Sequence, residues 1–394
     1  MKKTYTAVVG QIGFLVRFSP NLFIISLPII ADAFNTPLKH VQFTIPLYFL
    51  GAVISFLVSG PLSDMIGPYK TIKLLLPLFI IGAVICGSLQ TLFSLYVGTF
   101  IMGFGIASAI SLGKVMIKKL AETKQALATT VAIINIIGLW APSLAMVIGG
   151  HAALYFGWHT VFIINAALGL FTFVVILFVP IDVKEEEKKR LTFATTMKET
   201  FGNYSKLIVS PYFLMPTIVN ALLIGALYLH NTAGFYFYHK VLHLSIHLIS
   251  FSIVFITAGA FLGNFILIRT SKFLSYKSQV MLGISITALA SALFVVLAFI
   301  KPLGYWDIVV SVGLFMMGAG MLTPVNKIAI MDHFPNAVAT GVNFSSVMQM
   351  AACSVLSFIG AHLHFHTAIP LSLAYAGVTV VCLLLIFGFR KAFS

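Results

Sequence analysis

Long runs of apolar residues, separated by short polar clusters, cover almost the whole chain. With clusters of Lys, Arg, Pro, Gly and Asn as the breaks, the pattern predicts twelve helices, at 8–31, 41–62, 72–92, 94–117, 126–149, 159–180, 212–235, 247–268, 279–300, 307–331, 340–361 and 368–389. Each is long enough to cross a bilayer core, which needs about 20 apolar residues. Because each helix satisfies its own backbone in lipid, the pattern predicts an all-α membrane protein.

Composition supports this prediction. Only 9% of the residues are charged and 60% are hydrophobic, so the chain cannot give a core of this size a charged, water-soluble shell. The first segment is too long, and too closely followed by the second, for a cleaved signal peptide. The three cysteines, Cys86, Cys353 and Cys382, all fall inside apolar helices and predict no disulfide framework.

The net charge of +14 is distributed unevenly between the two sides of the predicted membrane. Of the 24 lysines and arginines, all except Arg17, Lys39, Lys240 and Lys301 fall on one side, which the positive-inside rule assigns to the cytoplasm. Both termini are therefore predicted to be cytoplasmic, in a multi-pass protein. The charge reflects topology and predicts no nucleic-acid partner.

The longest polar stretch, 182–211, divides the chain into two six-helix bundles, 1–181 and 212–394. Within this cytoplasmic linker, Phe193, Met197 and Phe201 form one apolar face, which suits a helix lying on the membrane surface. The bundles also repeat short sequences: 51–70 is similar to 259–277, and 103–105 is similar to 318–320. Such a repeat predicts a substrate site between the two bundles.

The sharpest motif follows the second predicted helix and runs from Gly60 through Asp64 and Gly67 to Lys70. It resembles the cytoplasmic loop signature of the major facilitator superfamily. Gly60 suits close helix packing and Gly67 a tight turn. The resemblance implies that Asp64 meets a cation at the end of the fourth helix, for which Lys114 is available, and so latches the cytoplasmic side.

A second resemblance lies in the fifth helix, where Pro142, Gly149 and Gly150 precede a Phe-Gly-Trp sequence at 156–158. This run is similar to one in Bcr/CflA-type drug/proton antiporters. The glycines and the proline predict a bend and close packing with the opposite bundle. The resemblance implies a transporter that exports drugs or metabolites.

The chain departs from that branch in its charges. Where the branch carries an acidic residue in the first helix, this chain has Asn21, and all ten acidic residues lie in loops or at helix ends. Basic residues stand on the helices expected to line the cavity instead. Arg17 is near the midplane, Lys327 is in the cytoplasmic third of the tenth helix, and His230 is near the outer end of the seventh.

A charge inside a bilayer is costly, by at least about 2.5–3.5 kcal/mol, so Arg17 is a candidate for substrate binding. The predicted substrate-binding set is Arg17, Phe18, Asn21, His230, Phe235 and Lys327. The alternatives are that Arg17 is a structural cation bonded to helix carbonyls or to Asn21, and that Lys327 extends to the cytoplasm or pairs with Asp332.

The sequence predicts no enzyme, no cofactor and no metal site. It has no metalloprotease, hydrolase or phosphate-loop motif. Nine of the eleven histidines fall near the outer face without cysteine or carboxylate partners, which favours polar loop residues over a metal site or a pH sensor.

Together these features predict a monomeric secondary transporter of the bacterial inner membrane, in contact with lipid. It would move a small anionic or zwitterionic molecule, such as a carboxylate metabolite or a carboxylate siderophore, by alternating access, with or without a coupling proton. One alternative is a multidrug/proton antiporter. A second is a membrane sensor that transports nothing, which the intact motif at 60–70 argues against.

Overall fold

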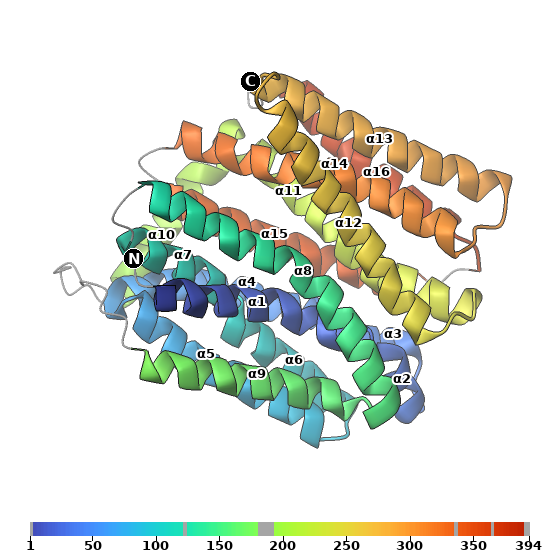
Figure 1. The fold of residues 1–394 in the computed structure, drawn as a ribbon, viewed down its shortest axis with the longest axis horizontal. Helices are drawn as coiled ribbons and strands as arrows, with labels where there is room; N and C mark the ends of the chain where they lie inside the picture. The colour runs from blue at the N-terminus through green and yellow to red at the C-terminus, as the bar shows by residue number, and fades with distance from the viewer. Residues whose placement is uncertain (1–2, 121–123, 180–192, 335–337, 364–365, 390–394) are drawn as a thin grey trace. The chain divides into compact units, whose positions relative to one another are not determined.

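The computed structural model describes residues 3–120, 124–179, 193–334, 338–363 and 366–389. The chain forms two compact units, Met1–Asn203 and Tyr204–Ser394. Helices joined by short loops make up the described residues, which include no strand, and this confirms the predicted all-α fold (Figure 1). Eleven helices within this part of the chain are long and apolar enough to cross a membrane. The fifth predicted helix, at 126–149, is not among these eleven and lies within α8.

The first unit contains α1 (Lys3–Ile24), α2 (Leu27–Ala33), α3 (Leu38–Gln42), α4 (Thr44–Ile66), α5 (Pro68–Ser88), α6 (Leu92–Ile106), α7 (Ala109–Leu120), α8 (Lys124–Phe156) and α9 (His159–Phe178). The first predicted helix, 8–31, is thus interrupted after Ile24. Pro28 stands in the first turn of α2, where its missing N–H costs nothing, so a new helix begins there. The fourth predicted helix is likewise divided between α6 and α7.

Helix α10 (Phe193–Ile208) crosses the boundary between the two units. Phe193 and Phe201, which predicted an apolar surface face, are 38% and 46% exposed. Tyr204, 4% exposed, stacks on Phe344 at 4.3 Å between ring centroids, and its hydroxyl accepts a hydrogen bond from the Asn343 amide at 3.0 Å. The end of α10 therefore packs on α15 (Val338–His362) within the second unit. The predicted linker charges at 182–192 lie outside the described residues.

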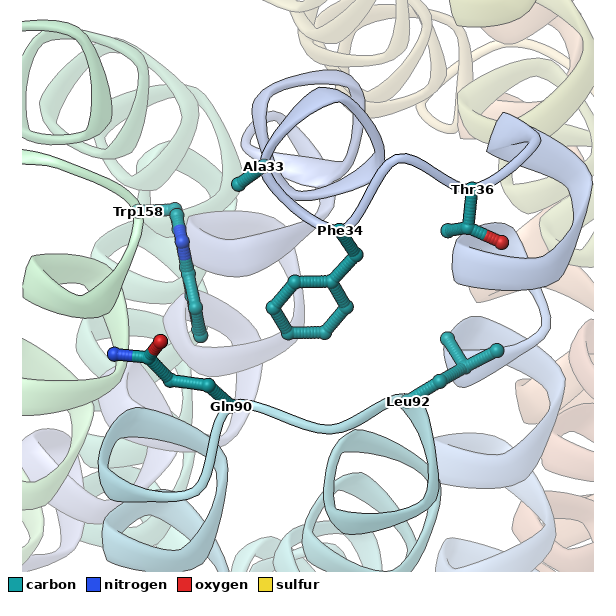
Figure 2. Close-up of a pocket in the computed structure, with 6 residues that line it drawn as sticks. All are labelled: Ala33, Phe34, Thr36, Gln90, Leu92 and Trp158. Atoms are coloured by element: carbon teal, nitrogen blue, oxygen red, sulfur yellow. The ribbon is translucent and has the colours of Figure 1, made fainter.

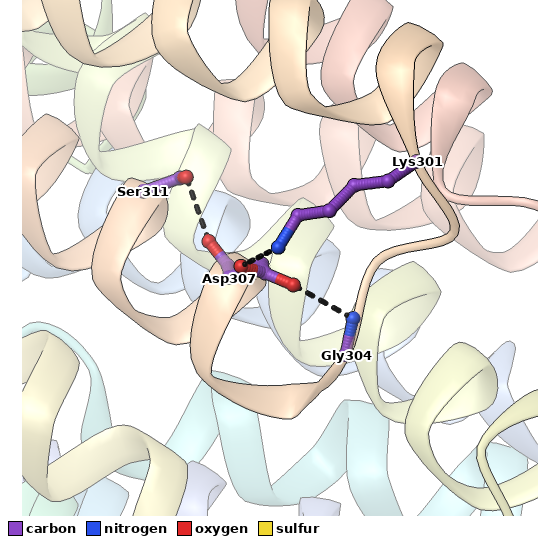
Figure 3. A network of polar contacts seen from close by, with 4 residues as sticks. All are labelled: Lys301, Gly304, Asp307 and Ser311. Atoms are coloured by element: carbon purple, nitrogen blue, oxygen red, sulfur yellow. Dashed lines mark hydrogen bonds and ion pairs between the residues drawn. The ribbon is translucent and has the colours of Figure 1, made fainter.

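The second unit contains α11 (Pro211–Leu229), the π-helices η1 (His230–Gly234) and η2 (Phe237–Val241), α12 (Ile246–Thr270), α13 (Tyr276–Ile300), α14 (Tyr305–His333), α15 (Val338–His362) and α16 (Ile369–Gly388). Figure 3 shows the polar contacts at the N-terminus of α14. Asp307 accepts hydrogen bonds from the Gly304 N–H at 3.0 Å and from Lys301 Nζ at 2.8 Å. The carboxylate therefore caps the helix N-terminus, which favours negative charge.

The two units repeat one packing scheme, as the similar sequences predict. In the first unit α6 packs on α4 and α5, and α1 packs on α8; in the second, α14 packs on α12 and α13, and α11 packs on α15. Glycines permit this close approach, because a Cβ at Gly103 would collide with the Tyr48 carbonyl on α4 and one at Gly320 with the Ala260 carbonyl on α12. A Cβ at Gly105 would meet Phe79 on α5 and one at Gly318 would meet Thr287 on α13, so Gly318 corresponds in its contact to Gly105, whereas sequence similarity had matched it with Gly103.

Candidate functional site

Arg17 lies on the face of α1 that packs against α8. Its Nη1 atom occupies the space that a Cβ at position 138 would take, so a larger residue there would displace the guanidinium. The side chain is half-buried. Figure 1 shows α1 and α8 side by side along this stretch of the first unit. Arg17 therefore joins two helices that are far apart in the sequence.

The position of Pro142 adds to the chemistry of this contact. Pro142 is inside α8, four residues after Gly138. Proline has no N–H, so it cannot donate the usual helical hydrogen bond to the Gly138 carbonyl. The guanidinium thus packs at a turn of α8 where the Gly138 carbonyl lacks its usual helical donor. This arrangement fits both a structural cation and a ligand site.

Asn21, one turn after Arg17, is 1% exposed. Its amide nitrogen donates to the Arg17 carbonyl at 2.8 Å, so the amide bonds the backbone of Arg17 and leaves the guanidinium to other partners. Among the described residues its Oδ1 has no hydrogen-bond partner. A buried acceptor without a donor is costly, which makes Oδ1 a candidate contact for a substrate donor or a water. Phe18, 2% exposed, stacks on Phe14 at 4.9 Å.

Two more buried polar groups of the first unit were missed by sequence reasoning. Asn165 on α9 is fully buried and donates weakly to the Ser19 carbonyl at 3.5 Å, while its Oδ1 has no partner within the described part of the chain. Tyr48 on α4 is 3% exposed, and its hydroxyl lies beside that of Ser19. The available signal was a polar side chain within an otherwise apolar segment.

His230 stands where α11 becomes a π-helix, and it is fully buried. The helical span continues to Val241, so the prediction that His230 lies near the outer end of its helix is wrong. The misplaced end has a local cause: the polar and glycine residues at 230–234 resemble a helix terminus in sequence, but the backbone continues through them as π-turns. Phe235 packs against the His230 ring at 6.2 Å, so the structure brings these two predicted residues together.

Lys327 is half-buried on α14, and the side chain of its predicted partner Asp332 lies outside the described residues. The residue beside it, Asn326, is fully buried, and neither atom of its amide has a hydrogen-bond partner in the described ranges. Asn326 is thus another polar group that the sequence did not single out.

The loop motif lies between α4 and α5. Gly67 has φ +86°, a conformation that glycine favours, and it separates the two helices. Gly60 is half-buried, and Asp64 and Lys70 are exposed at the ends of α4 and α5. Lys114 is on α7, but its side chain lies outside the described residues, so the latch with Asp64 stays a prediction.

The motif also contains a contact that sequence reasoning missed. The Tyr69 hydroxyl donates to the carbonyl of Ile176 and lies 2.8 Å from that of Val179, at the C-terminal end of α9. Lys73 Nζ lies 4.5 Å from the centre of the Tyr69 ring. The last carbonyls of a helix have no partner within it, so Tyr69 satisfies groups that would otherwise lack one.

Tyr69→Phe is expected to lower the stability of the protein by roughly 1 kcal/mol, because it removes these hydrogen bonds and keeps the ring. Thermal unfolding in lipid nanodiscs measures the change. Tyr155→Phe is the matched control, since Tyr155 is 70% exposed. Equal unfolding temperatures for the two variants would contradict this role of Tyr69.

The glycines of α8 pack within their own unit. A Cβ at Gly149 would collide with the Leu22 carbonyl of α1, and Gly150 is buried nearby. The prediction of close packing between this segment and the opposite bundle therefore does not describe Gly149. The reason is that α1 and α8 are neighbours inside the first unit, and small residues allow their backbones to approach.

A cavity of about 370 Å³ lies at the end of the first unit where α2, α5, α6 and α9 meet. Figure 2 shows the Phe34 ring pointing into it and Trp158 forming one wall. These two rings are 5.4 Å apart in an edge-to-face arrangement. The cavity is lined by Ala33, Phe34, Thr36, Gln90, Leu92 and Trp158. This lining contains no charged side chain and none of the predicted site residues.

Comparisons with known proteins agree with this architecture. The model of the Major Facilitator Superfamily matches residues 11–361. A bicyclomycin resistance protein homolog of Haemophilus influenzae is 19% identical over 96% of this chain and 94% of its own length. Multidrug resistance protein D of Escherichia coli is 25% identical over 86% of this chain and 84% of its own.

Solved structures show the same fold at low sequence identity. The xylose transporter XylE of E. coli, in a partially occluded inward-open conformation, is 15% identical, with a TM-score of 0.73 over 98% of this chain and 97% of its own. The nucleoside transporter NupG is 14% identical, with a TM-score of 0.67 over the full length of both chains.

Proposed function

We infer that this chain, which belongs to the Major Facilitator Superfamily, moves a small anionic or zwitterionic organic molecule by alternating access. The family match supports a multi-pass membrane transporter of a small molecule rather than an enzyme. Its relatives are bacterial, which favours the inner membrane, and the distribution of lysine and arginine favours cytoplasmic termini.

The anionic substrate class is inferred from the placement of Arg17. Its charge lies well inside an apolar helix, it is held against α8 at Gly138, and Asn21 offers an unused oxygen one turn away. A guanidinium binds carboxylates through two parallel hydrogen bonds. We assign Arg17 and Asn21 to the substrate carboxylate or an adjoining donor, and Phe18, His230, Phe235 and Lys327 to the same substrate-binding set. A carboxylate metabolite and a carboxylate siderophore both fit this chemistry.

The second candidate is a drug/proton antiporter. It is supported by the relatives, since two of them are named for drug resistance. A cationic drug would need an acidic partner, and the sequence has no acidic residue in the middle of a predicted membrane helix. The charge of the transported molecule therefore separates the two candidates.

Flux in proteoliposomes tests both. The purified protein is reconstituted, and transport of radiolabelled citrate and of ethidium is measured with and without a pH gradient. Citrate flux above that of protein-free liposomes supports the anion transporter. Ethidium flux without citrate flux supports the drug antiporter, and flux of neither probe contradicts both as stated.

For the gate, Asp64→Asn is expected to slow turnover much more than it lowers the amount of folded protein. The physical reason is that the amide loses the charge-assisted attraction that closes the cytoplasmic side, worth about 1–3 kcal/mol. Turnover in proteoliposomes is compared with Glu199→Gln, a change on α10. Wild-type turnover in Asp64→Asn would exclude the latch.

A further inference from the structure

We propose that His230 carries the coupling proton of the transport cycle, taking it up at Nδ1. This inference rests on the transport function proposed above. Proton coupling needs a buried group that can gain and lose a proton near neutral pH, and imidazole does so between about pH 5 and 8.

The backbone at His230 departs from a regular α-helix. The helix changes from α to π at His230, and π-turns within helices occur frequently at functional sites. A Cβ at Gly234 would lie 2.8 Å from both Cε1 and Nδ1 of His230. Gly234 therefore leaves the space that the imidazole occupies, and a larger residue there would press on the proton-accepting atom.

One nitrogen of the ring is engaged and the other is not. Nε2 lies 3.5 Å from the Tyr238 hydroxyl, a long hydrogen bond that works with either group as donor. Nδ1 is buried and has no partner among the residues that the structure describes. The next residue, Asn231, is 1% exposed, and both atoms of its amide also lack a described partner. Buried polar groups are normally satisfied, so this turn has hydrogen-bonding capacity left for a proton, a water or a substrate.

Aromatic rings surround the His230 side chain. Phe235, Tyr238 and Tyr375 lie at steep angles to the imidazole, at 6.2, 5.7 and 6.4 Å between ring centroids. These rings carry no negative charge, so a proton bound at Nδ1 is not held permanently, as it would be beside a carboxylate.

The titratable groups that face His230 are few. They are Tyr238 on η2 and Tyr375 on α16, and Tyr305 of α14 stands behind Tyr238 at 5.7 Å. From α15, Gly360 faces this turn at Thr232. Within the described residues, the contacts of His230 include no carboxylate, lysine or arginine. Asp307, the acid at the start of α14, is engaged with Lys301 and Gly304.

The step balances as a simple proton transfer. A proton from solvent on one side of the membrane binds the Nδ1 lone pair and forms an N–H bond, giving an imidazolium. On the other side the same bond breaks, the proton returns to solvent, and neutral imidazole remains. An anionic substrate near the protonated ring would be favoured, which links the proton to the proposed substrate class.

The first test is transport by His230→Gln, whose side chain keeps hydrogen-bonding groups but cannot carry a proton. Citrate and ethidium are both used as probes. We expect the variant to lose accumulation of a transported probe in a pH gradient, and to lose much less of its exchange across the membrane at equal pH. Gradient-driven accumulation at the wild-type level would overturn the proposal. His362→Gln, at an exposed histidine, is the matched control.

A second variant covers the case in which His230→Gln does not fold. Gly234→Ala keeps the imidazole and presses a methyl group against Nδ1, so it should reduce gradient-driven accumulation more than exchange. Gly377→Ala is its control, because nothing lies within 4 Å of a Cβ there. Unchanged coupling in Gly234→Ala, with correct folding, counts against the proposal.

Proton binding can be measured without any substrate. In nanodiscs, the wild type should bind about one more proton per chain than His230→Gln as the solution is titrated from neutral to acidic pH. Equal proton binding by the two proteins would refute the proposal. If the wild type moves neither probe, the proposed substrate class fails, whereas this titration still decides whether His230 binds a proton.

Discussion

Replacing Arg17 with glutamine is expected to weaken binding of an anionic probe roughly ten- to hundredfold. The lost charge-assisted contact is worth about 1.5–3 kcal/mol, which corresponds to that change in the dissociation constant. A neutral probe should be affected little, because it gains nothing from the positive charge. Binding of radiolabelled citrate to the purified protein measures the effect.

Arg17→Lys should restore only part of the affinity, since a single ammonium lacks the planar fork that binds a carboxylate through two hydrogen bonds. Arg269→Gln provides the matched control. Arg269 is exposed on α12, and its guanidinium lies 5.0 Å from the centre of the Phe265 ring. If Arg269→Gln weakens citrate binding as much as Arg17→Gln does, a general effect of net charge explains the result.

The packing of Arg17 on Gly138 also provides the measurement that separates a ligand contact from a structural cation. If Arg17 is a structural cation, Arg17→Gln lowers the free energy of unfolding and leaves the citrate affinity of the folded protein unchanged. If Arg17 contacts the substrate, the variant weakens citrate binding and leaves the free energy of unfolding unchanged. Gly138→Ala adds a second arm, because its methyl group would displace the Arg17 guanidinium while the charge stays in the chain.

Gly103→Ala is expected to destabilise the protein by about 1–3 kcal/mol, the usual cost of inserting a methyl group where there is no room. The added Cβ would meet the Tyr48 carbonyl, a backbone atom that cannot rotate away as a side chain can. Helices α4 and α6 would have to separate, and their packing is part of the scheme that both units repeat. Unfolding in lipid nanodiscs by heat or denaturant measures the loss.

Gly202→Ala on α10 serves as the control for this change, since no atom lies within 4 Å of a Cβ there. A Gly103→Ala protein as stable as this control would mean that α4 and α6 tolerate a wider spacing than the structure has. Gly263→Ala should behave like Gly103→Ala in the second unit, because its Cβ would meet the Met317 carbonyl.

The sequence by itself determined the class of fold. Runs of about 20 apolar residues report directly on bilayer thickness, and lysine and arginine placement predicts orientation, because both depend on the local composition of each segment. The turn at Gly67 was also predictable, since a glycine followed by a proline specifies the local backbone. The family followed from the same residues, and the family match confirms it.

Only the tertiary structure decided which side chains meet. That Arg17 packs on Gly138 and Tyr69 reaches the end of α9 depends on how each helix is rotated about its axis, and hydrophobic segments in lipid are apolar on all sides and carry little record of rotation. The surroundings of His230 at the π-turns are equally invisible in the sequence, because its buried ring packs against Gly234 and against Tyr375, which is far away in the chain. Composition specifies that a helix crosses the membrane, whereas packing between helices far apart in the chain decides which of its residues are placed to do chemistry.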